Sequence, residues 1–137
     1  MISFNNVSVS FDLPNGESRT VVENVSMDLG RSDMAYLIGP TGSGKSTLLR
    51  LLYMDRFPDE GVAQIGDYRS DLIDRSEIPY LRRSLGVVFQ DFQLLPDRSA
   101  YDNVAFALYA TGKKRSEVKS RTMKALTRVG LNHKRSN

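Results

Sequence analysis

The residues with the clearest chemical potential form one stretch of nine, Gly39, Pro40, Thr41, Gly42, Ser43, Gly44, Lys45, Ser46 and Thr47. The stretch fits the phosphate-binding pattern G-x-x-x-x-G-K-S/T from Gly39 to Ser46. Glycines let the backbone curl so that its N–H groups approach an anion closely, and a following helix points its positive end at the same place. Lys45 can reach terminal phosphates as a point charge, and the Ser46 hydroxyl is an oxygen ligand of the kind that Mg²⁺ prefers. The stretch therefore predicts a phosphate site.

A position between a strand and a helix is the context that confirms this pattern as a phosphate site. Residues 33–38 are a short, mostly apolar run, which is typical of a buried parallel strand. Residues 46–54 are dense in leucine and predict a helix that Thr47 opens. The alternative interpretation, a Gly/Ser turn that happens to precede a lysine, leaves both neighbours unexplained.

The first part of the chain predicts an α/β domain that begins with an antiparallel β region. Residues 2–11 alternate apolar and polar with a change of phase near Asn5 and Asn6, where we expect a bulge. A turn at residues 14–16 leads to a second alternating run at 25–29. Residues 62–65 predict a short strand, residues 76–84 a helix capped by Ser76, and residues 85–89 a second buried strand that ends at Gln90. Because ligands bind at the carboxyl ends of parallel strands, Gln90 and the phosphate loop should share one edge of the sheet.

After Pro96 the pattern becomes helical. Ser99 and Asp102 have the spacing of a capping box and predict the start of one helix. Ser116 is expected to cap a second helix. The apolar stripe expected on that helix consists of Val118, Ala125, Leu126 and Val129.

Composition excludes several classes of protein. The 137 residues are 40% hydrophobic and 26% charged, with no cysteine, so disulfide frameworks and cysteine metal sites are excluded. No apolar run approaches the roughly 20 residues of a membrane span, and the first residues do not resemble a signal peptide, so we expect a cytoplasmic protein. The last 26 residues hold nine Lys and Arg against one acidic residue. Without interleaved aromatic residues this basic tail is interpreted as a solvated helix face, and no nucleic-acid partner is expected.

Two further positions connect the pattern to a known family. Phe11 precedes the loop in the hairpin region, and Gln90 follows a strand 45 residues after Lys45. This arrangement resembles the ATPase subunits of ABC transporters, in which an aromatic residue stacks on adenine and a glutamine loop senses Mg²⁺ and the membrane partner. The string LRRSLGVVFQDFQLLPDRS followed by YDNVA, within residues 81–105, is similar to the cell-division branch of that family, the FtsE subfamily. Phe11 stands where the subfamily usually has tyrosine, and it keeps the stacking face.

The resemblance implies an α/β P-loop NTPase of ABC type that binds ATP and Mg²⁺ and hydrolyses ATP. Nucleotide contacts are implied for Phe11 and residues 39–47, catalytic roles for Lys45 and Gln90, and Mg²⁺ ligation for Ser46 and Gln90. The implied partners are a second copy of the full-length ATPase and an integral membrane protein of the FtsX type. The implied place is the inner face of the cell membrane, as a peripheral protein that couples ATP to cell-wall opening during division.

The resemblance covers residues 2–131 and indicates the front part of a longer domain. Family members continue into an LSGGQ-type signature, an apolar strand that ends in Asp-Glu and a histidine switch, and none of these occurs here. Isolated hydrolysis is therefore expected to be slight. We expect residues 1–95 to belong to the ATP-binding core and residues 96–137 to begin a helical subdomain. The alternatives are another ABC system, such as a lipoprotein-release exporter, an ATP-binding fragment without hydrolysis, and a nucleic-acid-binding P-loop protein suggested only by the basic tail.

Overall fold

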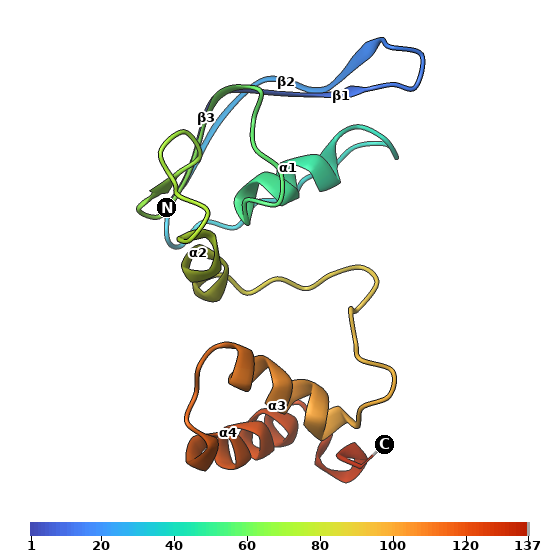
Figure 1. Cartoon of the computed structure of the whole chain (residues 1–137), viewed down its shortest axis with the longest axis vertical. Coiled ribbons are helices and arrows are strands. Elements are labelled where there is room, and N and C mark those ends of the chain that lie inside the picture. The colour runs from blue at the N-terminus through green and yellow to red at the C-terminus, as the bar shows by residue number, and fades with distance from the viewer. Residues whose placement is uncertain (137) are drawn as a thin grey trace. The chain divides into compact units, whose positions relative to one another are not determined.

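A computed structural model describes residues 1–136 (Figure 1). Its elements in chain order are β1 (Ile2–Asp12), β2 (Ser18–Leu29), α1 (Lys45–Leu52), β3 (Glu60–Ile65), β4 (Tyr68–Arg69), α2 (Ile78–Ser84), α3 (Ala100–Ala110), α4 (Arg115–Arg128) and the 3-10 turn η1 (Asn132–Lys134). The chain divides into two compact units, Met1–Gly86 and the residues from Val87 onward. The boundary expected near residue 95, between an ATP-binding core and a helical subdomain, stays a prediction.

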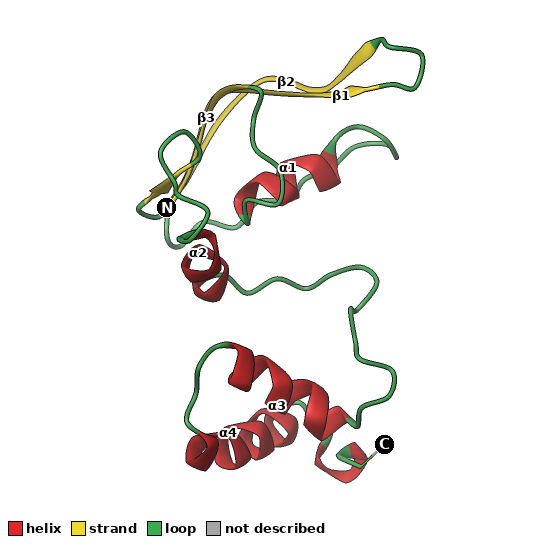
Figure 2. Cartoon of the chain, in the orientation of Figure 1, coloured by secondary structure: helices red, strands yellow, loops and turns green. Residues whose placement is uncertain are grey.

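The first unit contains an antiparallel sheet with the strand order β2-β1-β3-β4 (Figure 2). β1 pairs with β2 on one side and with β3 on the other, which confirms the antiparallel β region expected at the start of the chain. The register of β1 against β2 shifts between Phe4 and Val7, and Asn6 has a φ of 49°. This is the expected bulge, and it brings Phe4, Val7 and Val9 into the core together.

The core of this unit lies between the sheet and the first two helices. The sheet contributes Phe4, Val7, Val9, Val22, Ala63 and Ile65, and the helical side contributes Leu51, Met54 and Leu81. Arg82 of α2 donates to the backbone carbonyls of Tyr53 and Met54, at 2.9 and 3.1 Å. α2 is thereby attached to the C-terminal end of α1, whereas the phosphate motif precedes the N-terminal end of α1.

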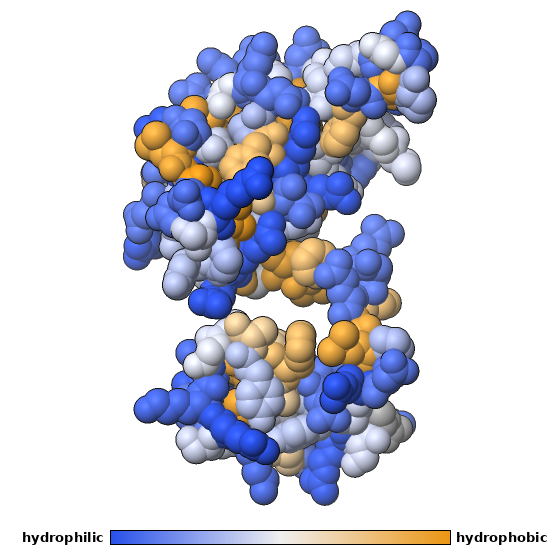
Figure 3. All heavy atoms as spheres, in the orientation of Figure 1, coloured by the Kyte–Doolittle hydropathy of each residue, from blue (hydrophilic) through white to orange (hydrophobic). Residues whose placement is uncertain are grey.

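The two buried parallel strands expected at residues 33–38 and 85–89 are not formed. Both segments are drawn as loop in Figure 2, and most of their apolar side chains are exposed, with Ile38 at 89% and Val88 at 95%. Leu85 and Phe89 are half-buried, and Leu85 packs against the core of the first unit. Figure 3 shows apolar atoms at the surface of each unit. A strand exists through hydrogen bonds to a neighbouring strand. Within residues 1–136 neither segment pairs with another strand. An apolar run is therefore not enough to form a strand at either place.

The starts of α1 and α2 differ from the sequence expectation by one or two residues. α1 begins at Lys45 instead of Ser46 and ends at Leu52, since Met54 has a φ of 50°. α2 begins at Ile78 with Glu77 as its N-cap, so Ser76 is not the cap. Ser76 instead donates its backbone N–H to the Asp74 carboxylate at 2.8 Å, in a turn that precedes the helix.

The second unit contains the antiparallel pair α3 and α4, joined by a short turn at Gly112. The Ser99 hydroxyl accepts the backbone N–H of Asp102 at 3.1 Å, which confirms the expected N-cap of α3. Lys114 stands at the N-cap of α4, so the expected cap at Ser116 was wrong. The buried stripe of α4 is Val118, Thr122 and Leu126, whereas Ala125 and Val129 are exposed.

Val118 and Leu126 of the expected stripe are confirmed, whereas Ala125 and Val129 were wrong and Thr122 was missed, because the stripe was assigned to apolar residues alone. Thr122 lies one helical turn from both Val118 and Leu126, and the spacing i, i+4, i+8 puts all three on one side of the helix. Among the described residues no helix is long and apolar enough to cross a membrane.

Candidate nucleotide-binding site

The phosphate loop packs against the sheet through its last glycine. Gly44 is buried, has a φ of 87°, and is the N-cap of α1. A Cβ atom at Gly44 would lie 2.6 Å from the Val21 carbonyl oxygen of β2, which no side chain tolerates. Glycine at this position is therefore required by the left-handed backbone and by the close approach to β2. This contact fixes the loop beside one end of the β1–β2 pair.

The side chain of Lys45 turns back onto the loop that precedes it. Its ammonium nitrogen donates to the carbonyl oxygens of Gly39 at 2.8 Å and Pro40 at 2.6 Å, and lies 3.5 Å from the Ser43 hydroxyl. The loop is thus curled around a cation carried by the first residue of α1. The structure brings together the first and last parts of the motif, and the contact of Lys45 with a phosphate stays a prediction.

The N-terminal end of α1 adds further positive potential. No side chain caps this end, and its first turn contains no acidic residue. The first N–H groups of a helix have no partner inside the helix and carry the positive end of its dipole. With Lys45 in the same turn, this end of α1 favours an anion such as a phosphate group.

Phe11, the residue expected to stack on adenine, lies near the end of β1 and is 36% exposed. It is paired with Arg19 of β2, two residues from the Val21 carbonyl that touches Gly44. Two residues of a strand span about 7 Å, so the ring and the phosphate loop lie at the same end of the sheet.

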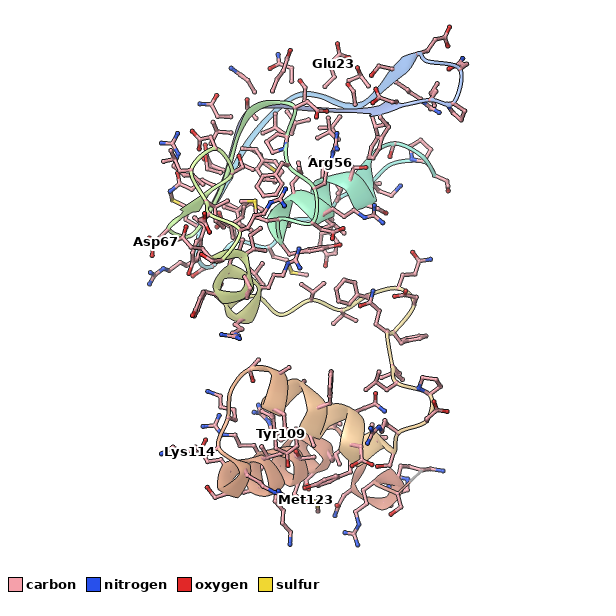
Figure 4. All side chains as sticks on the ribbon, in the orientation of Figure 1. Glu23, Arg56, Asp67, Tyr109, Lys114 and Met123 are labelled. Atoms are coloured by element: carbon pink, nitrogen blue, oxygen red, sulfur yellow. The ribbon has the colours of Figure 1, made fainter. Side chains whose placement is uncertain are left out.

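One residue beside Phe11 was missed by sequence reasoning. The Arg56 guanidinium carbon lies 5.2 Å from the centroid of the Phe11 ring, and Arg56 lies between the sheet and α1 (Figure 4). Arg56 follows α1 in the loop that leads to β3, 45 residues from Phe11. No spacing or motif in the sequence connects the two, since only the fold brings that loop to the end of β1.

With this geometry established, known proteins offer a comparison. The ABC transporter family model matches residues 22–137. The chain belongs to the ABC transporter family.

Individual ABC relatives are similar over most of the chain. FtsE, the cell division ATP-binding protein of Streptococcus pneumoniae serotype 2 strain D39, is 41% identical over 115 residues, which are 84% of this chain and 50% of that protein. FtsE of Bacillus subtilis strain 168 is 39% identical over 121 residues, 88% of this chain and 52% of that protein. The methionine import ATP-binding protein MetN 1 of Pectobacterium atrosepticum is 37% identical over 134 residues, 98% of this chain and 39% of that protein. The chain spans about half the length of the FtsE proteins that it matches.

Solved structures of the ABC transporter cassette MJ0796 share the fold. A dimeric post-hydrolysis state with bound ADP and Pi superposes with a TM-score of 0.86 at 28% identity, covering 100% of this chain and 60% of that one. A second dimeric structure of MJ0796 gives a TM-score of 0.87 at the same identity and coverage. The ABC-type fold expected from the sequence is confirmed.

Gln90 of this ABC transporter chain belongs to the second unit, so its position at the phosphate loop stays a prediction. It is exposed and precedes a tight turn in which Phe92 and Gln93 have φ values of 57° and 45°. The Gln93 N–H donates to the Asp91 carbonyl at 2.7 Å within that turn. The segment after Gln90 thus has a defined local backbone that no pattern in the sequence indicated.

The residues that could hold Mg²⁺ in this ABC transporter chain are few and carry neutral oxygen ligands. The Ser46 hydroxyl is exposed in the first turn of α1. Gln90 carries an amide oxygen in the second unit, and its place at a Mg²⁺ ion stays a prediction. Among residues 1–136 no group of three or more His, Asp and Glu side chains could hold a metal. Mg²⁺ commonly keeps several waters and binds through substrate phosphates with one or two protein ligands. A hydroxyl beside the phosphate loop fits that mode, in which the ion arrives with the nucleotide.

Proposed function

We propose that this chain binds ATP at residues 39–47 and forms the ATP-binding front of an ABC-type ATPase subunit. The observation that carries the proposal is the position of Lys45, whose ammonium group bonds to the loop carbonyls at the uncapped start of α1. An anion placed there meets a cation, the loop amides and the helix N–H groups together.

Each site residue has a binding or positioning role in this proposal. Lys45 and the loop amides hold the phosphates, Phe11 stacks on adenine, and Ser46 and Gln90 hold the Mg²⁺ that neutralises phosphate charge. Gln90 also faces the attacking water. Phosphoryl transfer to water requires mainly positioning and charge stabilisation from a protein. Hydrolysis is proposed for the whole protein, of which this chain corresponds to about half by comparison with FtsE.

The specific form of the proposal is an FtsE-like role in cell division. It is supported by FtsE relatives that are 34–41% identical and by the string that surrounds Gln90. The whole protein is proposed to pair with an integral membrane protein of the FtsX type, as a cytoplasmic subunit on the inner face of the cell membrane. The dimeric MJ0796 structures support a homodimer of the whole ATPase.

A second candidate is the ATPase subunit of another ABC system. Two MetN methionine importer subunits are 36–37% identical over 98–100% of this chain, which is broader coverage than the FtsE of Streptococcus pneumoniae gives. A lipoprotein-release exporter is a further system of the same class. All of these candidates keep the same ATP site and differ in the membrane partner.

Crosslinking of the whole protein in cells tests the partner. The chain contains no cysteine, so Asp97→Cys introduces the only thiol within residues 1–137. Because Asp97 lies after Gln90 and before α3, a thiol-reactive photocrosslinker there should capture a membrane protein. Asp67→Cys, between β3 and β4, is the matched control. Capture of a division protein supports the FtsE-like role, capture of a methionine permease supports the second candidate, and crosslinks only within the ATPase contradict a partner surface at Asp97.

A further inference from the structure

Arg56 is anchored to the residue that precedes Phe11. Its Nη2 atom donates to the Ser10 carbonyl oxygen at 2.9 Å and to the two Asp59 carboxylate oxygens at 2.9 and 3.1 Å. The Asp59 carboxylate in turn accepts the backbone N–H of Ser10 at 2.6 Å. Ser10, Arg56 and Asp59 thus form a closed set of bonds at the end of β1.

This anchor holds a cation against an exposed aromatic ring. The guanidinium carbon lies 5.2 Å from the Phe11 ring centroid, within the range of about 6 Å in which a cation is attracted to a ring face. A half-exposed phenylalanine near a strand end would otherwise be free to change rotamer. The contact with Arg56 restricts the ring from one face, and the Phe11 side chain as a whole is 36% exposed.

We infer that Arg56 is a positioning residue for nucleotide binding: it holds the Phe11 ring in place so that adenine stacks on the face that Arg56 does not cover. The inference rests on the proposed ATP site and adds a residue to it. Ordering a flexible side chain on binding costs about 0.5–1.5 kcal/mol, which corresponds to about a two- to twelvefold change in affinity. A ring already held by Arg56 avoids that cost.

The location of Arg56 explains why it should affect binding of the adenine base and not of the phosphates. Arg56 contacts residues at the end of β1, whereas the phosphate loop is fixed by Gly44 against Val21 of β2. The Lys45 ammonium bonds to the carbonyl oxygens of Gly39 and Pro40 within the phosphate loop. Loss of Arg56 should therefore weaken ligands that carry a base and spare ligands that are phosphate alone.

The Nε atom of Arg56 allows a substitution that tests nucleotide binding without lowering the stability of the fold. This atom is buried and has no hydrogen-bond partner, which is unfavourable for the folded protein. Arg56→Lys removes that donor and keeps a cation near the ring. The lysine variant should therefore fold well and retain part of the affinity for ATP.

The test is calorimetric titration of the chain with Mg·ATP and, separately, with Mg·tripolyphosphate. The variants are Arg56→Met, Arg56→Lys, Phe11→Ala and the double variant Phe11→Ala/Arg56→Met. The matched control is Arg83→Met, because Arg83 lies 5.3 Å from the centroid of the exposed Tyr80 ring on α2, the helix attached to the far end of α1. Far-UV circular dichroism checks folding, and Arg56→Gln replaces Arg56→Met if the methionine variant is unfolded.

We expect Arg56→Met to weaken ATP binding about two- to twelvefold and to change tripolyphosphate binding less than about twofold. The affinity of Arg56→Lys for ATP should lie between those of the parent and Arg56→Met. Arg83→Met should bind ATP as the parent does. In the Phe11→Ala background the Arg56 substitution should cause no further loss, because there is no ring to hold. The inference is overturned if Arg56→Met binds ATP like the parent, weakens both ligands equally, or adds its loss in full to that of Phe11→Ala. A parent chain that binds neither ligand would instead overturn the proposed ATP site.

Discussion

The ammonium nitrogen of Lys45 lies 2.8 Å from the carbonyl oxygen of Gly39, so the first glycine of the phosphate motif is bonded to its lysine. Residues 39–45 are thereby closed into a loop around a positive charge. The same lysine begins α1, and the glycine before it touches β2. The motif is thus anchored to the sheet on one side and opens a helix on the other.

The aromatic ring of Phe11 should matter to nucleotide binding through its face. Phe11→Tyr keeps that face and should bind Mg·ATP within about twofold of the parent, whereas Phe11→Ala should lose about 1–3 kcal/mol of stacking, or about 5- to 150-fold in affinity. Equilibrium dialysis with labelled ATP measures both variants. If the alanine variant binds as tightly as the parent, Phe11 serves only packing at the end of β1.

The buried hydroxyl of Thr122 should destabilise the folded α3–α4 pair. Thr122 is fully buried, and its hydroxyl oxygen has no hydrogen-bond partner. Thr122→Val replaces the hydroxyl by a methyl group of similar size and should raise the free energy of unfolding by about 1 kcal/mol. Urea unfolding followed by circular dichroism measures the change. The exposed Thr127→Val is the control and should shift by less than about 0.5 kcal/mol.

A Thr122→Val variant that is less stable than the parent would show that the hydroxyl has a partner in solution. If Thr122→Val and Thr127→Val raise the free energy of unfolding equally, burial of the Thr122 hydroxyl is not the cause of the gain. Either result would change the assignment of the α4 stripe at this position.

These 137 residues alone should bind ATP and hydrolyse it hardly at all. A P-loop ATPase needs an aspartate on its Mg²⁺ and a group that orients water, and no apolar strand ending in acidic residues follows Gln90 in this sequence. Losing such groups costs orders of magnitude in rate, at about 1.4 kcal/mol of barrier per tenfold step. Phosphate release under excess Mg·ATP measures the rate. Turnover at an ordinary enzymatic rate would contradict this expectation.

Local signals in the sequence predicted those features of the fold that depend on neighbouring residues. The bulge at Asn6 followed from a change of phase, the cap at Ser99 from its distance to Asp102, and the helix after the loop from its leucines. Each of these features is decided within a few residues of chain. Sequence patterns therefore carried most of the information about them.

Features that depend on distant partners could not be predicted in the same way. Residues 33–38 and 85–89 have the composition of buried strands, yet within residues 1–136 no strand pairs with them. The contact between Arg56 and Phe11 joins a loop to a strand end 45 residues away. Thr122 is buried although it is polar, because its spacing from Val118 and Leu126 puts it on the side of α4 that is covered.

The most direct test of the account is the affinity of the chain for Mg·ATP with and without the Lys45 ammonium. Lys45→Ala keeps the backbone amides of the loop and the start of α1, and removes the cation together with its bonds to the Gly39 and Pro40 carbonyls. A charge-assisted contact is worth about 1.5–3 kcal/mol, so isothermal titration calorimetry should show affinity falling about 10- to 150-fold. The exposed Lys119→Ala on α4 is the control and should bind as the parent does. Equal affinities of the parent and Lys45→Ala would contradict the assignment of this loop as the nucleotide phosphate site.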